Sequence, residues 1–297
     1  MEKQKYEYRI IAFIDILGFK NIIESKFCDE ILRLLITFQD EVKKKSYFEE
    51  YVDNKMITDG LSPEIKNKTI KLQDRQVSLF SDLVVISYSN DRSNLNQSIL
   101  ELYSQILNLH NKLLPLNVLL RGGITYSKLL HDNTICFGEG LIKAYELESK
   151  KSKYPRIIID PKILTNKTLK NIFDIKFPQI EEFDDGNYGF SYFNSCKKLI
   201  SRIETDTEIL NPKNPYYKMN GDISTKFGIY CELTSIKKLV DTCVENFYRH
   251  IRADNINDRE KLDWLMNEYD KILTRLIVAT EDNEFYRKLY LNLELRK

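Results

Sequence analysis

The chain alternates between unbroken apolar runs and stretches in which apolar residues recur every three to four positions. Residues 8–15 (YRIIAFID) are apolar almost throughout, which predicts a strand buried on both faces. From Phe19 the spacing becomes helical and predicts a long amphipathic helix, whose apolar stripe is Ile31, Leu34, Leu35, Phe38 and Val42. Residues 52–71 are polar and contain Gly60 and Pro63, so they predict a loop.

The next segments continue the alternation of strands and helices. Residues 75–89 (RQVSLFSDLVVISYS) have two strand-like arms and predict a hairpin with Asp82 at its tip. Residues 93–115 predict a helix that Pro115 ends. There follow a strand at 117–130 interrupted by Gly122-Gly123, a helix at 137–152 opened by glycines, a strand at 155–160, a short helix or turn, and a last strand pair within 183–194.

This order predicts an α+β fold, namely a ferredoxin-like palm with a mixed sheet and helices on one face. We expect the palm to occupy residues 1–200 and a helical region to occupy 201–297. In the second region, 211–222 is interpreted as a linker and 235–251 and 258–277 as helices. The apolar stripe of the last helix is typical of packing against the first domain or a second subunit rather than of a ligand site.

Composition narrows the functional class. Hydrophobic residues make up 42% and charged residues 30% of the 297 residues, as in a soluble globular protein. The net charge of +1 argues against a protein that coats nucleic acid or a membrane surface. No apolar run is long enough to cross a bilayer and no signal peptide precedes the first strand, so we expect a cytoplasmic protein. The five cysteines form no CxxC pair and are interpreted as reduced thiols.

Two carboxylates stand out against this apolar background. Asp15 ends the first strand and Asp82 lies at the hairpin tip, each flanked by apolar residues. A buried charge costs several kcal/mol unless it is paired or bound to a metal. If the strand and hairpin pair, the two carboxylates meet at one sheet edge and could hold Mg²⁺ or Mn²⁺. The alternative is that Asp15 caps the next helix and Asp82 only makes the turn.

The turn after Asp15 suggests a phosphate site beside this pair. Gly18 lets a ligand approach closely, and the amides at the start of the next helix attract phosphate. A nucleoside triphosphate fits such a combination of metal ligands and phosphate cradle.

These segments together resemble a known family. FIDILGF (13–19), FSDLVVIS (80–87), LRGGITYSKLL (120–130), FGEGLIKAYELES (137–149) and YPRIIID (154–160) are similar to motifs of the class III nucleotidyl cyclases. The resemblance is greatest to the bacterial pyrimidine cyclases of Pycsar anti-phage systems, which make cyclic UMP or cyclic CMP. It spans about residues 10–195.

The resemblance implies roles for individual residues. Asp15 and Asp82 match the metal-binding aspartates, and Ile16 matches the position whose carbonyl helps to hold a metal, with two Mn²⁺ or Mg²⁺ per site. The triphosphate-binding turn is matched by Leu17, Gly18 and Phe19. Ser78 matches a position that contacts the base. Arg121 and Arg156 lie on strands near the expected site, where a bidentate arginine can stabilise charge on phosphorus.

The chain also departs from the purine cyclases of this class. Ile142 and Glu146 stand where those enzymes carry an Asn and an Arg, and 183–194 shows no triphosphate lysine. The family further implies a homodimer whose sites combine Asp15 and Asp82 of one chain with the RGGI and AYELE segments of the other.

The resulting prediction is an enzyme that converts UTP or CTP to the 3′,5′-cyclic monophosphate and pyrophosphate. It would act as the signal-producing component of an antiviral defence system, with a separate effector that responds to the cyclic nucleotide and with no DNA, RNA or membrane as partner. Two alternatives remain open: a purine cyclase or dinucleotide synthetase of related palm fold, and a non-catalytic sensor that binds nucleotide.

Overall fold

The computed structural model describes residues 5–44, 75–89, 95–113, 116, 118–132, 135–167, 180–191 and scattered positions from 260 to 278. The chain separates into two compact units, Met1–Ser191 and Tyr192–Lys297. The predicted boundary after residue 200, the loop at 52–71, the linker at 211–222 and the helix at 235–251 lie outside the described residues. In the second unit the described residues from Glu260 to Val278 are helical and Leu265 is buried, in agreement with the helix predicted over 258–277.

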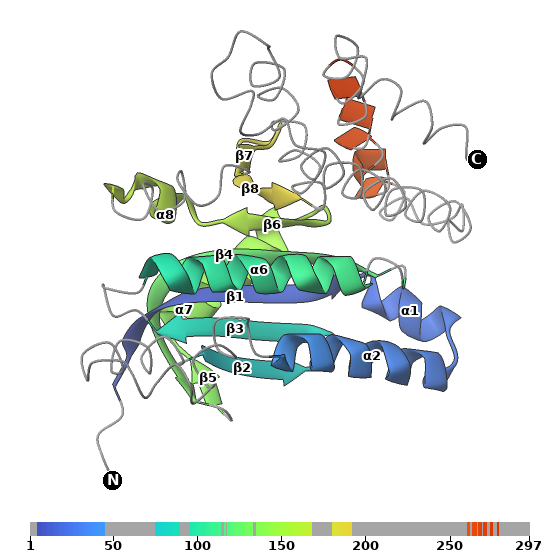
Figure 1. The fold of residues 1–297 in the computed structure, drawn as a ribbon, viewed down its shortest axis with the longest axis horizontal. Helices are drawn as coiled ribbons and strands as arrows, with labels where there is room; N and C mark the ends of the chain where they lie inside the picture. The colour runs from blue at the N-terminus through green and yellow to red at the C-terminus, as the bar shows by residue number, and fades with distance from the viewer. Residues whose placement is uncertain are drawn as a thin grey trace, which may run out of the picture. The chain divides into compact units, whose positions relative to one another are not determined.

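A mixed sheet forms the centre of the first unit (Figure 1). Its strands are β1 (Glu7–Leu17), β2 (Arg75–Phe80), β3 (Leu83–Ser89), β4 (Leu119–Asp132), β6 (Arg156–Ile159), β7 (Glu181–Glu182) and β8 (Tyr188–Ser191), and β5 (Ile135–Phe137) pairs with β4 beside this path. The spatial order is β2-β3-β1-β4-β6-β8-β7. The β4–β6 pair is parallel and the other pairs are antiparallel.

The first four strands of this path form the predicted palm. After β1 the chain passes through α1 (Phe19–Ser25) and α2 (Cys28–Lys43) to the β2–β3 hairpin, and then through α6 (Leu95–Leu113) to β4. The order β2-β3-β1-β4 with antiparallel neighbours is that of a split βαβ, ferredoxin-like arrangement. The predicted α+β class is therefore confirmed, and α6 ends two residues before Pro115 as expected.

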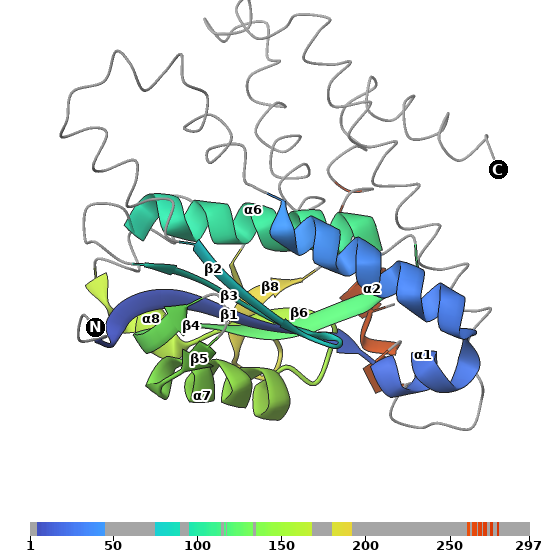
Figure 2. The same cartoon turned by 90° about the horizontal axis from the view of Figure 1, so that it is seen from below.

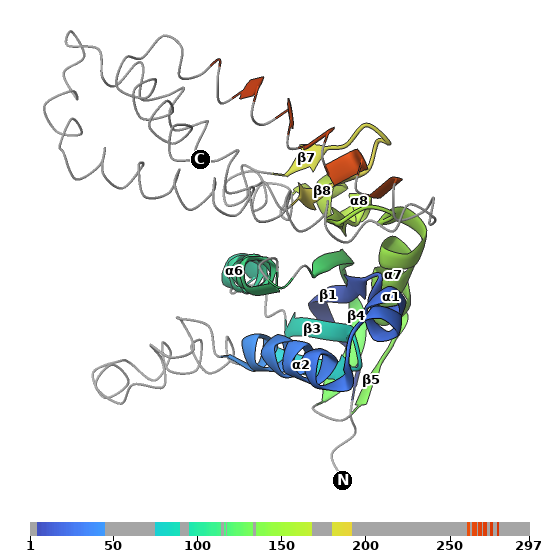
Figure 3. The same ribbon diagram turned by 90° about the vertical axis from the view of Figure 1, so that its right-hand side faces the viewer.

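Helices cover both faces of the sheet, so the prediction of helices on one face was wrong. In Figures 2 and 3, α2 and α6 lie on one side of the strands and α7 (Glu139–Glu146) lies on the other. The reason is in β1 itself: Ile10, Ile11 and Ala12 follow one another along the strand and are all fully buried. Successive side chains point to opposite faces, so both faces need a cover.

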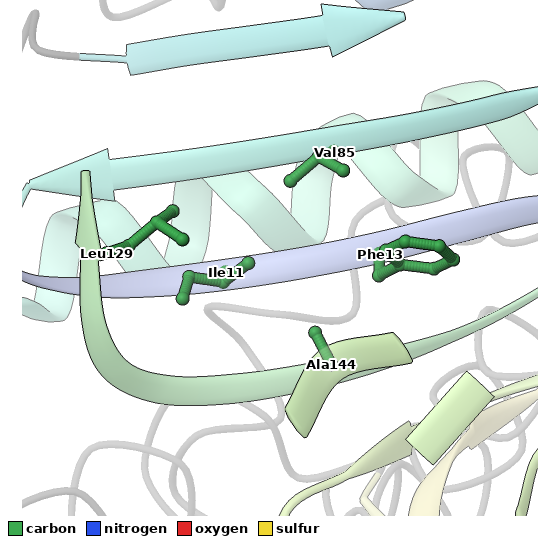
Figure 4. Packing of buried hydrophobic residues seen from close by; sticks show 5 residues of the cluster. All are labelled: Ile11, Phe13, Val85, Leu129 and Ala144. Carbon is green, nitrogen blue, oxygen red and sulfur yellow. The ribbon is translucent and has the colours of Figure 1, made fainter. Parts of the chain in front are cut away.

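The core beneath α7 unites strands that are distant in sequence (Figure 4). Ile11 and Phe13 of β1 pack with Val85 of β3, Leu129 of β4 and Ala144 of α7. Because side chains alternate along a strand, Asp15 lies on the same face of β1 as Ile11 and Phe13. The Asp15 side chain therefore follows Ile11 and Phe13 on the face of β1 that packs against α7.

Strand β4 runs without a break through Gly122 and Gly123, where the sequence predicted an interruption. The glycines serve close packing instead. A Cβ on Gly123 would lie 2.5 Å from Leu147 Cβ and 2.6 Å from the Ala144 carbonyl oxygen, and one on Gly122 would lie 2.6 Å from the Phe13 carbonyl oxygen. Gly123 therefore allows α7 and the turn after it to approach the sheet, and Gly122 allows close packing against β1 and β6.

Candidate active site

Three strands bring Asp15, Asp82 and Arg121 together. Asp15 pairs with Leu83 of β3 on one side and with Arg121 of β4 on the other. Directly opposed residues of antiparallel strands present their side chains on the same face. Asp82 immediately precedes Leu83 in the turn between β2 and β3. This register places the two aspartates at the same end of the neighbouring strands β1 and β3.

A backbone hydrogen bond ties the hairpin turn to the end of β1. The amide of Ile16 donates to the carbonyl oxygen of Asp82 at 3.1 Å. Ser81, the other turn residue, has a left-handed backbone with φ 56, a conformation that a non-glycine residue adopts only at some cost. The turn is thus held in one place, with Asp82 next to Asp15.

Arg121 contacts Asp15 through two nitrogens. Its Nε and Nη2 donate to Oδ2 of Asp15 at 3.2 and 3.1 Å. The Asp15 side chain is 18% exposed and that of Arg121 is 27% exposed, so the ion pair is only partly screened by water. The contact is made within one chain because β1 and β4 are neighbours in the sheet, whereas the family resemblance implies that Arg121 meets these aspartates from a partner chain.

Glu148, which the sequence analysis did not single out, is a third carboxylate at this site. It lies in the π-helical turn η2 (Leu147–Lys151) that follows α7, and its side chain is 4% exposed. Its Oε1 is 2.6 Å from Nε of Arg121. The signal was its spacing: Gly140, Ala144 and Glu148 recur every four residues, and the first two are the buried residues of α7.

The electrostatics of the site reflect burial and crowding. Burial raises the pKa of Asp15 to about 6, the charge of Arg121 opposes this rise, and the neighbouring Asp82 carboxyl adds to it by charge and by hydrogen bonding. Burial likewise raises the pKa of Glu148 to about 7, against Arg121 and together with Asp15 and Asp82. Asp15 and Glu148 share the guanidinium of Arg121, and Asp82 adds a third carboxyl, which leaves the site short of positive charge.

This donor set fits a divalent cation. Two adjacent, partly exposed carboxylates, one with a pKa raised by burial and further by its acidic neighbour, offer the oxygen ligands that Mg²⁺ and Mn²⁺ prefer. Asp15 and Asp82 would hold it. Among the described residues no three His, Cys, Asp or Glu side chains form a group that could hold a metal by themselves, so backbone, water or substrate oxygens would complete the coordination.

The turn at 17–19 adjoins this site along the chain. Gly18 has φ 77, in the left-handed region, and a Cβ built on it would meet no atom within 4 Å. The glycine is therefore required by backbone conformation and not by packing. Leu17 is half-buried and the Phe19 side chain is buried, so of the three predicted phosphate-binding residues only Gly18 combines open space with backbone freedom.

Ser78 belongs to a polar network on the same face of the sheet as Asp15. Its hydroxyl is 2.9 Å from Nε2 of His131, and Nδ1 of His131 is 2.8 Å from Oγ of Ser87. Nε of Arg9 donates to Ser87 Oγ at 2.8 Å. The network orients Ser78, whose contact with a base stays a prediction. His131 was not singled out in the sequence, because an isolated histidine carries no spacing signal.

Arg156 begins β6, the strand next to β4, and it directly precedes Ile157, which pairs with Gly122. Its side chain is 1% exposed and pairs with Asp185 in the β7–β8 turn, and its guanidinium lies over the ring of Phe183 at 4.4 Å. Nη2 also donates to the Lys151 carbonyl oxygen at 3.2 Å. These contacts join β6 to the β7–β8 hairpin, and they give a structural reason for Asp185, to which the sequence assigned no chemistry. A substrate role for Arg156 stays a prediction that would require these contacts to break.

The two positions that depart from the purine cyclases lie on the outer side of α7. Ile142 is 62% exposed, and Glu146 is exposed and pairs with Lys150 at 2.7 Å. Neither contacts the three carboxylates of the site in the described structure.

Comparisons with known proteins identify no family. No family model matches the chain, and no curated protein matches it. Among solved structures, a bacterial light-regulated adenylyl cyclase resembles it at 13% sequence identity and a TM-score of 0.33, over 53% of this chain and 78% of that one. So distant a likeness establishes no activity, and the chemistry of the site has to be inferred from its own residues. Among the described residues no helix combines the length and apolarity needed to span a bilayer.

Proposed function

We propose that this protein is a metal-dependent nucleotidyl cyclase that acts on a pyrimidine ribonucleoside triphosphate. The single observation that supports this most is the meeting of Asp15 and Asp82, 67 residues apart in the chain, beside Arg121 at the ends of neighbouring strands of a palm sheet. Metal ligands next to a guanidinium suit chemistry on a triphosphate, which is polyanionic and binds with a divalent cation.

The reaction forms one bond and breaks one. The ribose 3′-oxygen attacks the α-phosphorus, the bond from that phosphorus to the oxygen bridging the α- and β-phosphates breaks, and pyrophosphate leaves. The proton of the 3′-hydroxyl passes to solvent. Asp15 and Asp82 would hold a divalent cation, whose charge would lower the pKa of the 3′-hydroxyl and stabilise the leaving pyrophosphate.

The chain's own residues bind and orient. Gly18 leaves room for the triphosphate at the turn after β1, in the open space where a Cβ would meet nothing. Arg121 stabilises negative charge on the phosphoryl oxygens, to which a guanidinium can donate two hydrogen bonds. Ser78, held by His131, contacts the base.

The finer parts of the proposal rest on the resemblance described above. UTP or CTP is preferred because Ile142 and Glu146 cannot supply the amide and guanidinium of the purine enzymes. The protein acts in the cytoplasm as a homodimer during phage infection, and its cyclic product is read by a separate effector. The exposed apolar side chains of Ile142 and Tyr145 on α7 are consistent with a surface that a second copy covers.

A nucleotide-binding sensor is the second candidate, favoured by the contact between Arg121 and Asp15, which occupies an oxygen that a metal would use. One assay separates the candidates: the purified protein is incubated with Mn²⁺ and each of the four ribonucleoside triphosphates, and products are identified by mass spectrometry. Cyclic UMP or cyclic CMP supports the proposal. A purine cyclic nucleotide or a linked dinucleotide supports the related palm enzymes, and nucleotide binding without any product supports the sensor.

A further inference from the structure

One carboxylate oxygen of Asp15 is already engaged in hydrogen bonds. Oδ2 of Asp15 accepts hydrogen bonds from both Nε and Nη2 of Arg121. A divalent cation binds carboxylate oxygens at about 2.0–2.6 Å, and a guanidinium cannot share that oxygen at full strength. A cation that binds Oδ2 of Asp15 therefore competes with Arg121.

Arg121 has a second carboxylate within reach. Glu148 Oε1 lies 2.6 Å from Nε of Arg121, yet this buried oxygen accepts no hydrogen bond in the structure, because the Nε hydrogen is directed at Asp15. A buried carboxylate oxygen without a donor is costly. A small rotation of the guanidinium would satisfy it, and the same rotation would free Oδ2 of Asp15.

We propose that Glu148 is a positioning residue that takes over Arg121 from Asp15 when a divalent cation binds, an inference that rests on the proposed function. In the cation-free protein Arg121 stands in for the cation at Asp15. When the cation is bound, Glu148 holds Nε while the Nη nitrogens are free to face the triphosphate. Glu148 thus couples cation binding to the orientation of Arg121.

The charges at the site agree with this exchange. Asp15, Asp82 and Glu148 bring three negative charges when ionised, and Arg121 brings one positive charge. A single divalent cation balances the remaining two. Glu148 acts through Arg121, whose Nε lies 2.6 Å from its Oε1.

The test is a double-mutant cycle on Mn²⁺ affinity, measured by calorimetry on the full chain without nucleotide at about pH 8. Arg121→Gln removes the competitor, so Mn²⁺ should bind about 10-fold more tightly, since a hydrogen bond to a charged group is worth about 1.5–3 kcal/mol. Glu148→Gln removes the alternative partner, so Mn²⁺ should bind about 10-fold more weakly. In the Arg121→Gln background, Glu148→Gln should weaken Mn²⁺ binding by less than about 3-fold, because only the loss of its negative charge then affects the cation.

Glu146→Gln is the matched control. It also removes one negative charge, but from an exposed side chain two residues before Glu148. Its Mn²⁺ affinity should equal that of the wild type, and Glu148→Asp, which keeps the carboxylate, should recover part of the loss. An equal loss from Glu148→Gln in both backgrounds would make Glu148 a metal ligand and overturn the inference. An unchanged Mn²⁺ affinity in Glu148→Gln would make it merely structural and overturn it too.

The readout separates this inference from the proposed function. A wild-type protein that binds no Mn²⁺ contradicts the proposed function. A wild-type protein that binds Mn²⁺ while the two substitutions act independently contradicts only the role of Glu148. Should Arg121→Gln fail to fold, Arg121→Lys replaces it in the cycle. The loss of Mn²⁺ affinity caused by Glu148→Gln is then expected to be smaller in the Arg121→Lys background than in the wild-type background, because an ammonium lacks the paired donors of a guanidinium. An equal loss in the two backgrounds contradicts the inference.

Discussion

Arg121 on β4 stands opposite Asp15 on β1, and two of its nitrogens donate to the same carboxylate oxygen at 3.2 and 3.1 Å. This relationship is imposed by strand register, so any residue at position 121 would face Asp15. It makes the state of the Asp15 carboxylate depend on Arg121, and through Arg121 on Glu148. The following predictions concern the residues on which this arrangement depends.

Asp82→Ala should abolish turnover and leave the fold intact. Asp82 lies in a half-buried turn, so the free energy of unfolding should change by no more than about 0.5 kcal/mol. Product formation from UTP or CTP should fall by at least about 100-fold, since a metal ligand is lost. Asp132→Ala, at an exposed position at the end of β4, is the control and should keep full activity. Normal cyclisation by Asp82→Ala would show that the hairpin has been misassigned.

The stability of the metal-free protein should fall as pH rises from about 4 to about 7. The pKa of Asp15 rises from 3.8 to about 6 and that of Glu148 from 4.5 to about 7 on burial. The folded state then binds more protons than the unfolded chain within this window, so ionisation at higher pH favours unfolding. Below both sets of pKa values this contribution is fully present, and it is lost as pH rises through the folded values.

The double variant Asp15→Asn, Glu148→Gln isolates this contribution from the titration of other groups. Its melting temperature is followed by circular dichroism in the presence of a chelator between about pH 4 and about pH 7.5. It should decrease less with rising pH than the melting temperature of the wild type. Parallel curves for the two proteins would mean that these carboxyls titrate normally in the folded state.

Gly123→Ala should destabilise the protein by about 2–3 kcal/mol. The added methyl would lie 2.5 Å from Leu147 Cβ and 2.6 Å from a backbone oxygen of α7, so the helix must move away from the sheet. Because Glu148 follows Leu147 directly, the site should be disturbed as well. Gly186→Ala, which meets no atom within 4 Å, should cost only the strain of its φ of 74, about 1 kcal/mol. Chemical denaturation measures both, and equal stabilities would contradict the packing argument.

Asp185→Ala should destabilise the protein by a few kcal/mol, because it leaves the guanidinium of Arg156, 1% exposed, without its carboxylate. This variant decides between a structural and a substrate-binding role for Arg156. A structural role predicts a lower melting temperature with the KM for UTP or CTP unchanged at a temperature where the variant is folded. A raised KM at an unchanged melting temperature would instead support the substrate role.

Sequence patterns predicted the palm well because its signals are local. The unbroken apolar run of β1 and the helical stripe of α6 each depend on residues close together in the chain, and the structure confirms both. Gly122 and Gly123 were predicted to interrupt β4 because glycine weakens a strand, but Gly122 packs against β1 and β6 and Gly123 against α7, contacts that no local pattern reveals.

The site was predicted in part. Asp15 and Asp82 were recognisable as charges in apolar surroundings, and their pairing followed from the hairpin. Glu148 was missed because it belongs to the run ESKK, which is typical of an exposed helix end. In the structure its side chain is buried in the π-helical turn after α7, in line with the four-residue spacing from Gly140 and Ala144. The network of Ser78 and His131 joins residues 53 positions apart, a distance at which sequence carries no periodic signal.

The central claim is that Asp15 and Asp82 jointly bind a divalent cation. Titration of Mn²⁺ followed by electron paramagnetic resonance, on the wild type and on Asp15→Asn and Asp82→Asn, measures this without any need for turnover. We expect the wild type to bind Mn²⁺ and each substitution to weaken binding by at least about 10-fold, because half of the carboxylate donor set is lost. Wild-type affinity in either variant would contradict the account.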